Sequence, residues 1–263
     1  MGNRLAGNVC LITGGSGGIG AATARLFWHE GAAVSLVDLD AAALDDTARD
    51  ISPTGERIIV STANLVDEGE ASRVVDGTVD RFGKLDVLAN IAAVRVYGPV
   101  TEATSESWDH ILGVNLRAIA NCCKYAIPHM AASGGGSIVN VSSANASVGR
   151  SGMAQYDASK AALLALTRSM ACDHAKDGIR VNTVSPGPTL TPFHVRNRSV
   201  KTGETTAEAE AAIRAAGAPN TLLGRQAEPI EIAYAMLFLA GPESSYVTGA
   251  NFAIDGGISG LRS

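Results

Sequence analysis

The sequence has no long run of apolar residues. Its longest apolar stretch, Ile232–Ala240, has the length of a buried core helix, whereas about 18 consecutive apolar residues are needed to cross a bilayer. The first residues are not followed by the apolar core of a signal peptide, so export by that route is not expected. We therefore expect a cytoplasmic protein that is not inserted into a membrane.

Cysteine pairs with the spacing of metal ligands are also missing. None of the four cysteines (Cys10, Cys122, Cys123 and Cys172) belongs to a Cys-x-x-Cys motif. The adjacent Cys122 and Cys123 would point to different faces of a helix, which makes a poor metal site. The five histidines are scattered, without a pair at ligand spacing. We expect reduced thiols in the core and no structural or catalytic metal.

An excess of positive charge is missing too. The chain has 21 Lys and Arg residues against 26 Asp and Glu, a formal net charge of −5. It therefore lacks the basic surface that nucleic-acid-binding domains usually need. Its 263 residues, 46% hydrophobic and 18% charged, can supply a large buried core and argue against extensive disorder.

The sequence does contain a regular alternation of short β-branched runs and longer helical patterns. The first runs, VCLIT and AVSLV, are almost wholly apolar, as expected for strands with both faces buried. Such alternation is typical of βαβ units, and no linker or internal repeat interrupts it. We predict a single α/β domain over residues 1–263, Rossmann-like and doubly wound, with a mostly parallel seven-stranded sheet and helices on both faces. The predicted strands are Asn8–Thr13, Ala33–Asp38, Arg57–Ala63, Leu85–Ala89, Ser137–Ser142, Arg180–Ser185 and Asn251–Ile254, and the predicted helices begin near Gly18, Ala41, Asp67, Ser105, Ala154 and Pro229.

One segment, residues 192–223, departs from this alternation. It is polar and rich in alanine, and only Thr205–Ala216 has a weak helical pattern. Connections of this length are usually functional or disordered. We predict a flap that covers the substrate; the alternative is a solvated surface excursion.

A glycine-rich turn, from Gly14 to Gly20, follows the first predicted strand and opens the first predicted helix. Glycines in such a turn let backbone amides approach a pyrophosphate at the positive end of the helix. Asp38 ends the second predicted strand, where a carboxylate can bind the adenosine ribose and repel a 2′-phosphate. Gly17 stands where an arginine could hold that phosphate, so both features favour NAD over NADP. Asp38 could instead cap the next helix, but Asp40 is better placed for that.

Tyr156 and Lys160 are one helical turn apart in a strongly helical segment, so they share a helix face. Ser143 follows the predicted strand Ser137–Ser142, at the sheet edge where open α/β folds bind ligands. Free tyrosine titrates near pH ~10 and is a poor base at neutral pH, whereas a neighbouring ammonium lowers the pKa of a phenol. A Tyr–Lys pair alone usually marks a surface contact. Combined with the glycine turn, Asp38 and Ser143, it predicts a general acid–base.

Together these motifs resemble the short-chain dehydrogenase/reductase family over essentially the whole chain. The resemblance implies an NAD(H)-dependent oxidoreductase that interconverts a secondary alcohol (polyol, sugar, cyclic diol or hydroxyacyl type) and a ketone. It implies that Tyr156 is the catalytic acid–base, that Lys160 lowers its pKa and holds the nicotinamide ribose, and that Ser143 polarises the substrate oxygen. Asn115 would support a water in the proton relay. The residues that it implies for NAD binding are Gly14, Ser16, Gly18, Ile19, Asp38, Leu39, Asn64, Leu65, Asn90, Ala92, Tyr156, Lys160, Pro186, Gly187, Thr189 and Thr191.

Two positions depart from the pattern of the family. The Asn-Asn-Ala-Gly motif becomes Asn90-Ile91-Ala92-Ala93, which should narrow the nicotinamide side slightly. Asn64 replaces the aspartate that usually meets the adenine amino group; its amide oxygen can accept the same hydrogen bond, so binding should weaken little. Neither change affects the catalytic residues.

The resemblance also places Arg95, Asn145 and Arg150 beside Ser143 and Tyr156 as substrate-binding residues. Arg95 and Arg150 could meet an anionic group of a small-molecule alcohol or ketone; the alternative is that both point to solvent. A homotetramer is implied, built from the helices Ser105–Met130 and Ala154–Lys176 and the C-terminal strand, with a homodimer as the alternative.

Two other functions remain open. A catalytically silent NAD-binding protein that senses redox state would keep the glycine turn but typically lose Tyr156, Lys160 or Ser143, and all three are present. Another enzyme class on a Rossmann-like fold, such as a methyltransferase, could use Asp38 for the ribose of its cofactor. In such an enzyme Tyr156, Lys160 and Ser143 would have no shared purpose, so the sequence favours the dehydrogenase.

Overall fold

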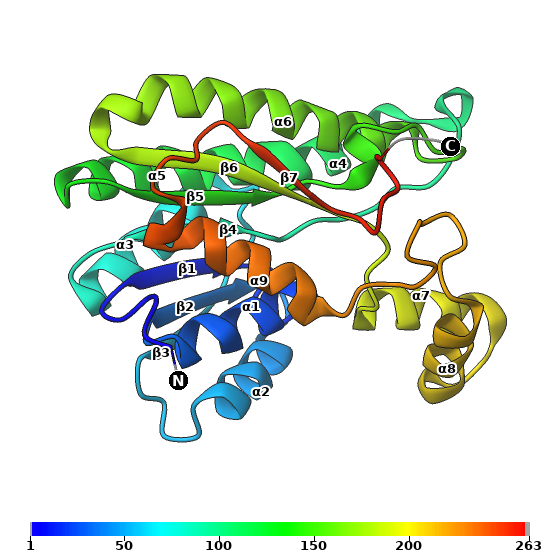
Figure 1. Ribbon diagram of the computed structural model, residues 1–263, viewed down its shortest axis with the longest axis horizontal. Coiled ribbons are helices and arrows are strands. Elements are labelled where there is room, and N and C mark those ends of the chain that lie inside the picture. Colours follow the sequence, from blue (N-terminus) through cyan, green and yellow to red (C-terminus); the bar gives the residue numbers. More distant parts are fainter. Residues whose placement is uncertain (1, 261–263) are drawn as a thin grey trace.

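A parallel sheet of seven strands is the centre of the computed structural model, which describes residues 2–260 (Figure 1). The strand order is β3-β2-β1-β4-β5-β6-β7, and every pair of neighbours is parallel. The predicted seven-stranded, Rossmann-like α/β fold is therefore confirmed. The strands are β1 Val9–Thr13, β2 Ala33–Asp38, β3 Ile58–Thr62, β4 Val87–Asn90, β5 Gly136–Val141, β6 Ile179–Pro186 and β7 Asn251–Ile254.

The strand order reverses between β1 and β4, and this reversal positions the site. From β1 the chain moves outward through β2 to β3, then returns to the other side of β1 for β4. Residues Val9–Thr13 are all buried because helices cover both faces of the sheet, which explains their apolar run. In open α/β sheets ligands bind beyond the carboxyl ends of the strands at such a reversal.

Helices cover both faces of the sheet, as predicted. One apolar core, which includes Phe27, Leu36 and Met236, lies under α1, α2 and α9; a second, which includes Leu88 and Leu163, lies under α3, α5 and α6. In Figure 1, α9 and α1 cross in front of the strands, whereas α6 runs along the top of the view. The helices are α1 Gly18–His29, α2 Ala41–Ile51, α3 Glu68–Phe82, α4 Ser105–Leu112, α5 Ala118–Ala132, α6 Ala154–His174, α7 Pro192–Thr202, α8 Thr206–Ala216 and α9 Pro229–Ala240, with short 3₁₀ turns at Val100–Glu102, Ala144–Ala146, Ala175–Asp177 and Pro242–Ser244.

The predicted helix Ser105–Met130 is divided in the structure. Between α4 and α5 the backbone forms a π-helical turn over Gly113–Arg117, which contains Asn115. Single π turns inside helices are rare and are frequent at functional sites. The hydrophobic periodicity does not reveal this turn, because the chain keeps the same overall direction through it.

The segment after β6 forms two short helices that pack on each other. Thr205–Ala216 was expected to be helical and forms α8, whereas α7 was not predicted. Its start signals are nevertheless present, because Pro192 occupies the first turn and the Thr191 side chain accepts a hydrogen bond from the His194 amide. Figure 1 shows both helices beyond the carboxyl end of β6. They enclose a small apolar core of Leu190, Val195, Ala209 and Ile213.

The cysteines follow the expectation with one exception. Cys10, Cys122 and Cys123 are buried, and burial raises the pKa of each thiol. Cys172 is exposed, so the expectation of a core thiol is wrong there, because the residue lies on the outward face of α6. Within residues 2–260, no helix is long and apolar enough to cross a membrane. That part of the chain also holds no group of three or more His, Cys, Asp or Glu side chains that could bind a metal ion.

Candidate active site

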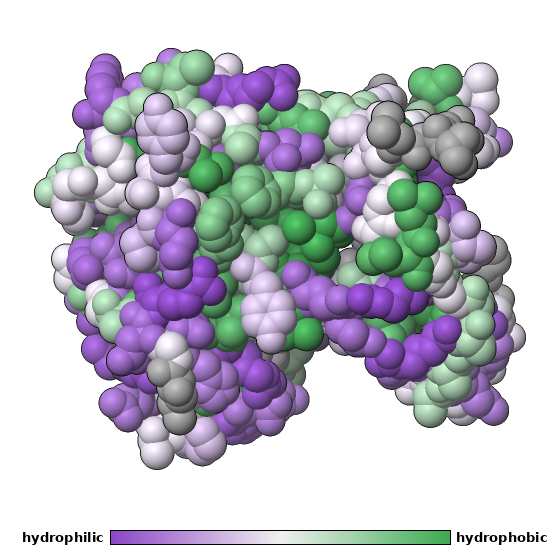
Figure 2. All heavy atoms as spheres, in the orientation of Figure 1, coloured by the Kyte–Doolittle hydropathy of each residue, from purple (hydrophilic) through white to green (hydrophobic). Residues whose placement is uncertain are grey.

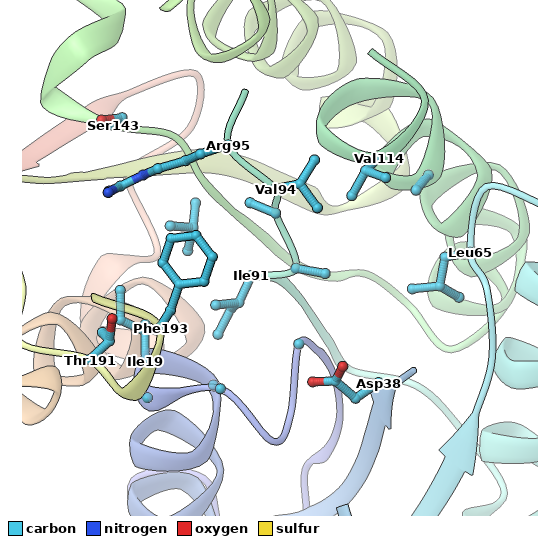
Figure 3. Close-up of a pocket in the computed structure, with 18 of the residues that line it drawn as sticks. Ile19, Asp38, Leu65, Ile91, Val94, Arg95, Val114, Ser143, Thr191 and Phe193 are labelled. Atoms are coloured by element: carbon cyan, nitrogen blue, oxygen red, sulfur yellow. The ribbon is translucent and has the colours of Figure 1, made fainter. Parts of the chain in front are cut away.

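A cavity of about 420 Å³ opens at the carboxyl ends of β1 and β4. Figure 3 shows Asp38 and Leu65 toward one side of it and Ser143, Arg95 and Phe193 toward the other. The structure thus brings residues from the ends of six strands, β1 to β6, and from helices α1, α4, α5, α6 and α7 to one site. Of the residues expected from the sequence, those that line the cavity are Gly14, Gly18, Ile19, Asp38, Leu39, Asn64, Leu65, Ala92, Arg95, Ser143, Tyr156, Lys160, Pro186, Gly187, Thr189 and Thr191.

The backbone of the glycine-rich turn lies so close to neighbouring backbone atoms that a side chain would not fit at Gly14 or Gly20. Gly14 has φ +70°, and a Cβ there would lie 2.9 Å from the backbone of Ala92. A Cβ on Gly20 would lie 1.9 Å from the carbonyl oxygen of Gly14. The N-terminus of α1 has no capping side chain and no acidic residue in its first turn. Its amides are therefore available to an anion, and the turn fits the pyrophosphate of a dinucleotide.

Asp38 is held in place at the end of β2 by three hydrogen bonds. Its Oδ2 accepts from the amide (3.2 Å) and hydroxyl (2.6 Å) of Ser16, and its Oδ1 accepts from the amide of Leu39 (2.8 Å). Ser16 does not itself line the cavity, so its contact with Asp38 is what connects it to the site. The alternative role of Asp38 as a helix cap is taken by Asp40, which accepts from the amide of Ala43.

Tyr156 and Lys160 lie on the inner face of α6, with side chains only 6% and 1% exposed. The Lys160 Nζ donates to the carbonyl oxygen of Val141 (2.8 Å) and lies 5.9 Å from the centroid of the Tyr156 ring. Burial, and next the positive charge of Arg95, lower the pKa of Lys160 to about 7. A lysine without a carboxylate partner is costly to bury, so a buried lysine beside a tyrosine at a cavity wall indicates a chemical role.

Ser143 follows β5 and faces the same cavity. Its Oγ accepts a hydrogen bond from the amide of Asn145 (3.2 Å), which leaves its hydroxyl proton free to be donated. A hydroxyl donor and a phenol on one wall can both contact the oxygen of a bound alcohol or ketone.

Asn115 and Asn90 are buried behind the cavity wall. The Asn115 side chain donates to the Val94 carbonyl (3.0 Å) and to the Ser159 hydroxyl (3.0 Å), and accepts from the Val94 amide (2.9 Å). Asn90 donates to the Asn140 side chain (2.8 Å). Neither side chain lines the cavity. Both therefore hold the wall in position, and their parts in the proton relay and in NAD binding remain predictions.

The other three residues expected to bind substrate, Arg95, Asn145 and Arg150, do not all lie at the cavity. The Asn145 side chain donates to Asp157 (2.8 Å), which also accepts from the backbone amide of Arg150, so neither Asn145 nor Arg150 lines the cavity. Their part in substrate binding remains a prediction that the geometry does not favour. Arg95 does line the cavity, so the alternative that both arginines point away from it is wrong for Arg95.

Several lining residues were not named individually from the sequence. Phe193 and His194 belong to the predicted flap, residues 192–223, and they reach the cavity because the helix start at Thr191-Pro192 turns the first residues of α7 toward it. The capping threonine and proline were the available signal. Gly17 and Gly20 belong to the predicted glycine-rich turn, and the family resemblance also implies Val94 at the substrate end. The remaining additions are Val37, Ala63, Val66, Ile91, Ala93, His110, Val114, Ala118, Val141 and Ser142.

Comparison with known proteins gives matches over nearly the whole chain. A family model described as enoyl-(acyl carrier protein) reductase matches residues 14–259. Cis-4-hydroxycyclohexanecarboxylate dehydrogenase of Sinomonas cyclohexanicum is 39% identical over 262 residues, 99% of this chain and 100% of that protein. Meso-2,3-butanediol dehydrogenase of Serratia marcescens is 37% identical, over 97% of this chain and 95% of that protein. The ligand-free structure of aldohexose dehydrogenase from Thermoplasma acidophilum superposes with a TM-score of 0.87 at 30% identity, covering 100% of this chain and 98% of that one.

Proposed function

Because the chain belongs to the short-chain dehydrogenase/reductase family and is an oxidoreductase acting on CH–OH groups, we propose that it interconverts a secondary alcohol and a ketone with NAD(H). The observation that carries this proposal is the Tyr156–Lys160 pair on α6, which faces the same cavity as Ser143 and the glycine turn. The dehydrogenases of cyclic and acyclic alcohols among its relatives support a substrate of one of these kinds.

The proposed chemistry assigns one task to each side chain. NAD⁺ held by the turn, by Asp38 and by the Pro186–Thr191 segment would supply the hydride acceptor. Ser143 binds the hydroxyl oxygen of the alcohol and holds its carbon toward that acceptor. The Tyr156 Oη takes the hydroxyl proton as the C–O bond gains carbonyl character, and it returns a proton in the reverse direction. Lys160 stabilises the phenolate with its ammonium charge.

A spectroscopic panel tests this proposal against the two other functions. Secondary alcohols such as meso-2,3-butanediol, cyclohexanol and cis-4-hydroxycyclohexanecarboxylate should produce NADH absorbance with at least one member. NADH binding without turnover of any member, also in the ketone direction, would favour a silent redox sensor. Binding of S-adenosylmethionine in place of NADH would favour a methyltransferase.

The cofactor preference gives a first expected result: the protein binds NAD(H) more tightly than NADP(H) by at least about tenfold, or about 1.4 kcal/mol. The Asp38 carboxylate lines the cavity at the end of β2, where we propose that the adenosine ribose binds, and it would repel a 2′-phosphate there. Titration of both cofactors gives the two dissociation constants. Asp38→Ala should narrow the ratio, chiefly by improving NADP(H) binding.

Asp40→Ala is the matched control for this experiment. This substitution also removes a carboxylate near the end of β2, but Asp40 caps α2 and does not line the cavity. It should leave the cofactor ratio unchanged. Equal affinity of the native protein for both cofactors, or a preference for NADP(H), would contradict the assignment of Asp38.

We further propose that residues 192–223 act as a flap over the substrate. Phe193 and His194 already line the cavity, while α7 and α8 pack mainly on each other through their own small core. Amide hydrogen exchange in α7 and α8 should slow when NAD and a good substrate or product are both bound, because the contact with ligand suppresses local opening. Exchange in α9, which lies outside the cavity, is the internal control. Unchanged exchange in α7 and α8 in the ternary complex would refute the flap.

The proposed assembly is a homotetramer, with a homodimer as the alternative. The outer face of α6 carries small exposed residues such as Ala161 and Ala165, which let helices approach closely. Figure 2 shows apolar residues gathered over β7 and α9, where Tyr234 is 57% exposed. A continuous apolar patch on a protein surface is typical of an interface.

A further inference from the structure

Arg95 is the cationic side chain at the substrate end of the cavity. It follows β4, is half-buried, and extends across the opening with its guanidinium between Ser143 and Phe193 in the view of Figure 3. Its Cζ lies 5.3 Å from the centroid of the Tyr156 ring and 5.7 Å from that of Phe193. Both distances are within the range of cation–π contacts, so the two rings help to hold the guanidinium at the cavity wall.

His194 fixes the orientation of Arg95. The Nδ1 of His194 lies 2.5 Å from the carbonyl oxygen of Thr189, which can only accept, so Nδ1 carries the proton. The Nε2 is then the acceptor for an N–H of Arg95, at 2.5 Å. Burial, and next the charge of Arg95, lower the pKa of His194 to about 4, consistent with this neutral tautomer. One N–H of the guanidinium is thus bound to a neutral partner, and within residues 2–260 its other N–H donors have no hydrogen-bond acceptor.

The charge of Arg95 has no ion-pair partner in the part of the chain that the structure describes. Arg95 has no acidic group within 4.0 Å there, whereas Arg4, Arg25, Arg198 and Arg225 each pair with one. Positive charges also act on its neighbours, since Arg95 and Arg150 lower the pKa of His194 and Arg95 lowers that of Lys160. In a chain with a net charge of −5, the guanidinium of Arg95 is thus a local positive charge that no carboxylate of residues 2–260 pairs with.

The surroundings of Arg95 indicate the rest of the ligand. Tyr156 packs in an apolar cluster with Ile111 and Met153, to which Val94 and Val96 on either side of Arg95 contribute. A hydrocarbon body would be desolvated there at little cost. A single free guanidinium matches one carboxylate in a bidentate contact, whereas a phosphate carries nearly twice that charge.

We propose that Arg95 binds a carboxylate on the substrate, so that the enzyme acts on secondary alcohols and ketones carrying a carboxylate on a small ring or short apolar chain. This inference rests on the proposed dehydrogenase function. With the carbinol oxygen on Ser143 and Tyr156, the closeness of Arg95 to the Tyr156 ring requires the carboxylate to belong to the same small molecule. Arg95 then selects the substrate and sets its orientation.

The test compares an acid with its uncharged analogue. We would measure kcat/KM for 4-hydroxycyclohexanecarboxylate, as both ring isomers, and for the corresponding carboxamides. A hydrogen bond to a charged group is worth enough to favour the acid about 10- to 100-fold. Arg95→Met should reduce this acid-to-amide ratio to within about threefold of one, and Arg95→Lys should restore only part of it, since lysine lacks the planar fork.

A binding experiment separates recognition from turnover. Calorimetric titration of the NADH-loaded protein with cyclohexanecarboxylate and with cyclohexanecarboxamide should show the same preference for the acid, and Arg95→Met should remove it. Arg150→Met is the matched control, since that arginine does not line the cavity, and it should keep the ratio. Loss of the ratio in Arg150→Met but not in Arg95→Met would assign the carboxylate elsewhere.

The remaining outcomes distinguish the two proposals. Turnover of neutral alcohols such as meso-2,3-butanediol with an acid-to-amide ratio below about three would refute the role of Arg95 and leave the dehydrogenase function intact. Equal losses for acid and amide in Arg95→Met would show that the arginine acts on the phenol of Tyr156 instead of on the substrate. Absence of turnover for every acid, amide and neutral alcohol would refute the dehydrogenase function itself.

Discussion

Replacing Tyr156 with phenylalanine is expected to lower turnover by at least about 100-fold, the lower end of what general acid–base groups contribute, and to leave NAD binding nearly intact. The phenol oxygen is the atom proposed to accept or give the proton. The ring is packed against Ile111 and Met153, and phenylalanine keeps that packing. Within the described residues the Tyr156 hydroxyl makes no hydrogen bond, so its removal leaves no partner unsatisfied.

The measurement has three parts: kcat and KM on one good substrate, the dissociation constant of NADH, and the melting temperature. Tyr125→Phe is the control for removal of a phenol, because the Tyr125 hydroxyl contacts Glu68 on the surface, away from the cavity. It should keep normal turnover. A Tyr156→Phe protein that retains more than about a tenth of the native rate, above what the loss of a general acid–base allows, would overturn the mechanism.

The sheet and the placement of Tyr156 beside Lys160 could be predicted because local sequence determines both. Residues Val9–Thr13 and Ala33–Asp38 are apolar runs because helices bury both faces of their strands, and each strand begins or ends within a few residues of its predicted limit. Tyr156 and Lys160 share a face of α6 through helical spacing alone. Gly14 and Gly20 could be predicted to form a tight turn because no other residue fits there.

The substrate end could not be predicted because tertiary contacts determine it. Arg95 and Arg150 are chemically alike in the sequence, and only the rings beside Arg95 and the anchoring of the Arg150 backbone by Asp157 place one inside the cavity and the other outside. His194 becomes a neutral acceptor only where α7 meets the loop after β4. A lone histidine in a polar segment carries no local signal of such a contact.

Replacing Lys160 with methionine is expected to lower turnover by at least about 100-fold and yet to stabilise the ligand-free protein at neutral pH. The Lys160 side chain is fully buried, and within the described residues its ammonium has the Val141 carbonyl as its hydrogen-bond partner and no carboxylate. Burial and the charge of Arg95 lower its pKa from 10.5 to about 7. Methionine fills a similar volume without a charge to desolvate.

The lowered pKa of Lys160 determines how the stabilisation by Lys160→Met changes with pH. Between pH 7 and 10.5 the unfolded chain keeps the proton on Lys160 while the folded chain has lost it, so the unfolded state binds more protons and stability rises with pH. The destabilisation by Lys160 is complete below about pH 7 and disappears toward pH 10.5. The gain in unfolding free energy from Lys160→Met should therefore be larger at pH 7 than at pH 9, by about 2 kcal/mol.

Urea unfolding of both proteins at the two pH values, without cofactor, measures this difference directly. Loss of the hydrogen bond to Val141 shifts the variant by the same amount at both pH values, so the change between them belongs to the charge. Lys176→Met, at an exposed lysine, should give equal effects at pH 7 and pH 9. NADH should raise the unfolding free energy of the native protein more than it raises that of the Lys160→Met variant. The reason is that the Lys160 ammonium, which is costly in the free protein, is proposed to hold the nicotinamide ribose. Equal gains at both pH values would mean that Lys160 has the same pKa in the folded protein and in the unfolded chain. The lysine would then be a structural residue, without the lowered pKa on which this prediction rests.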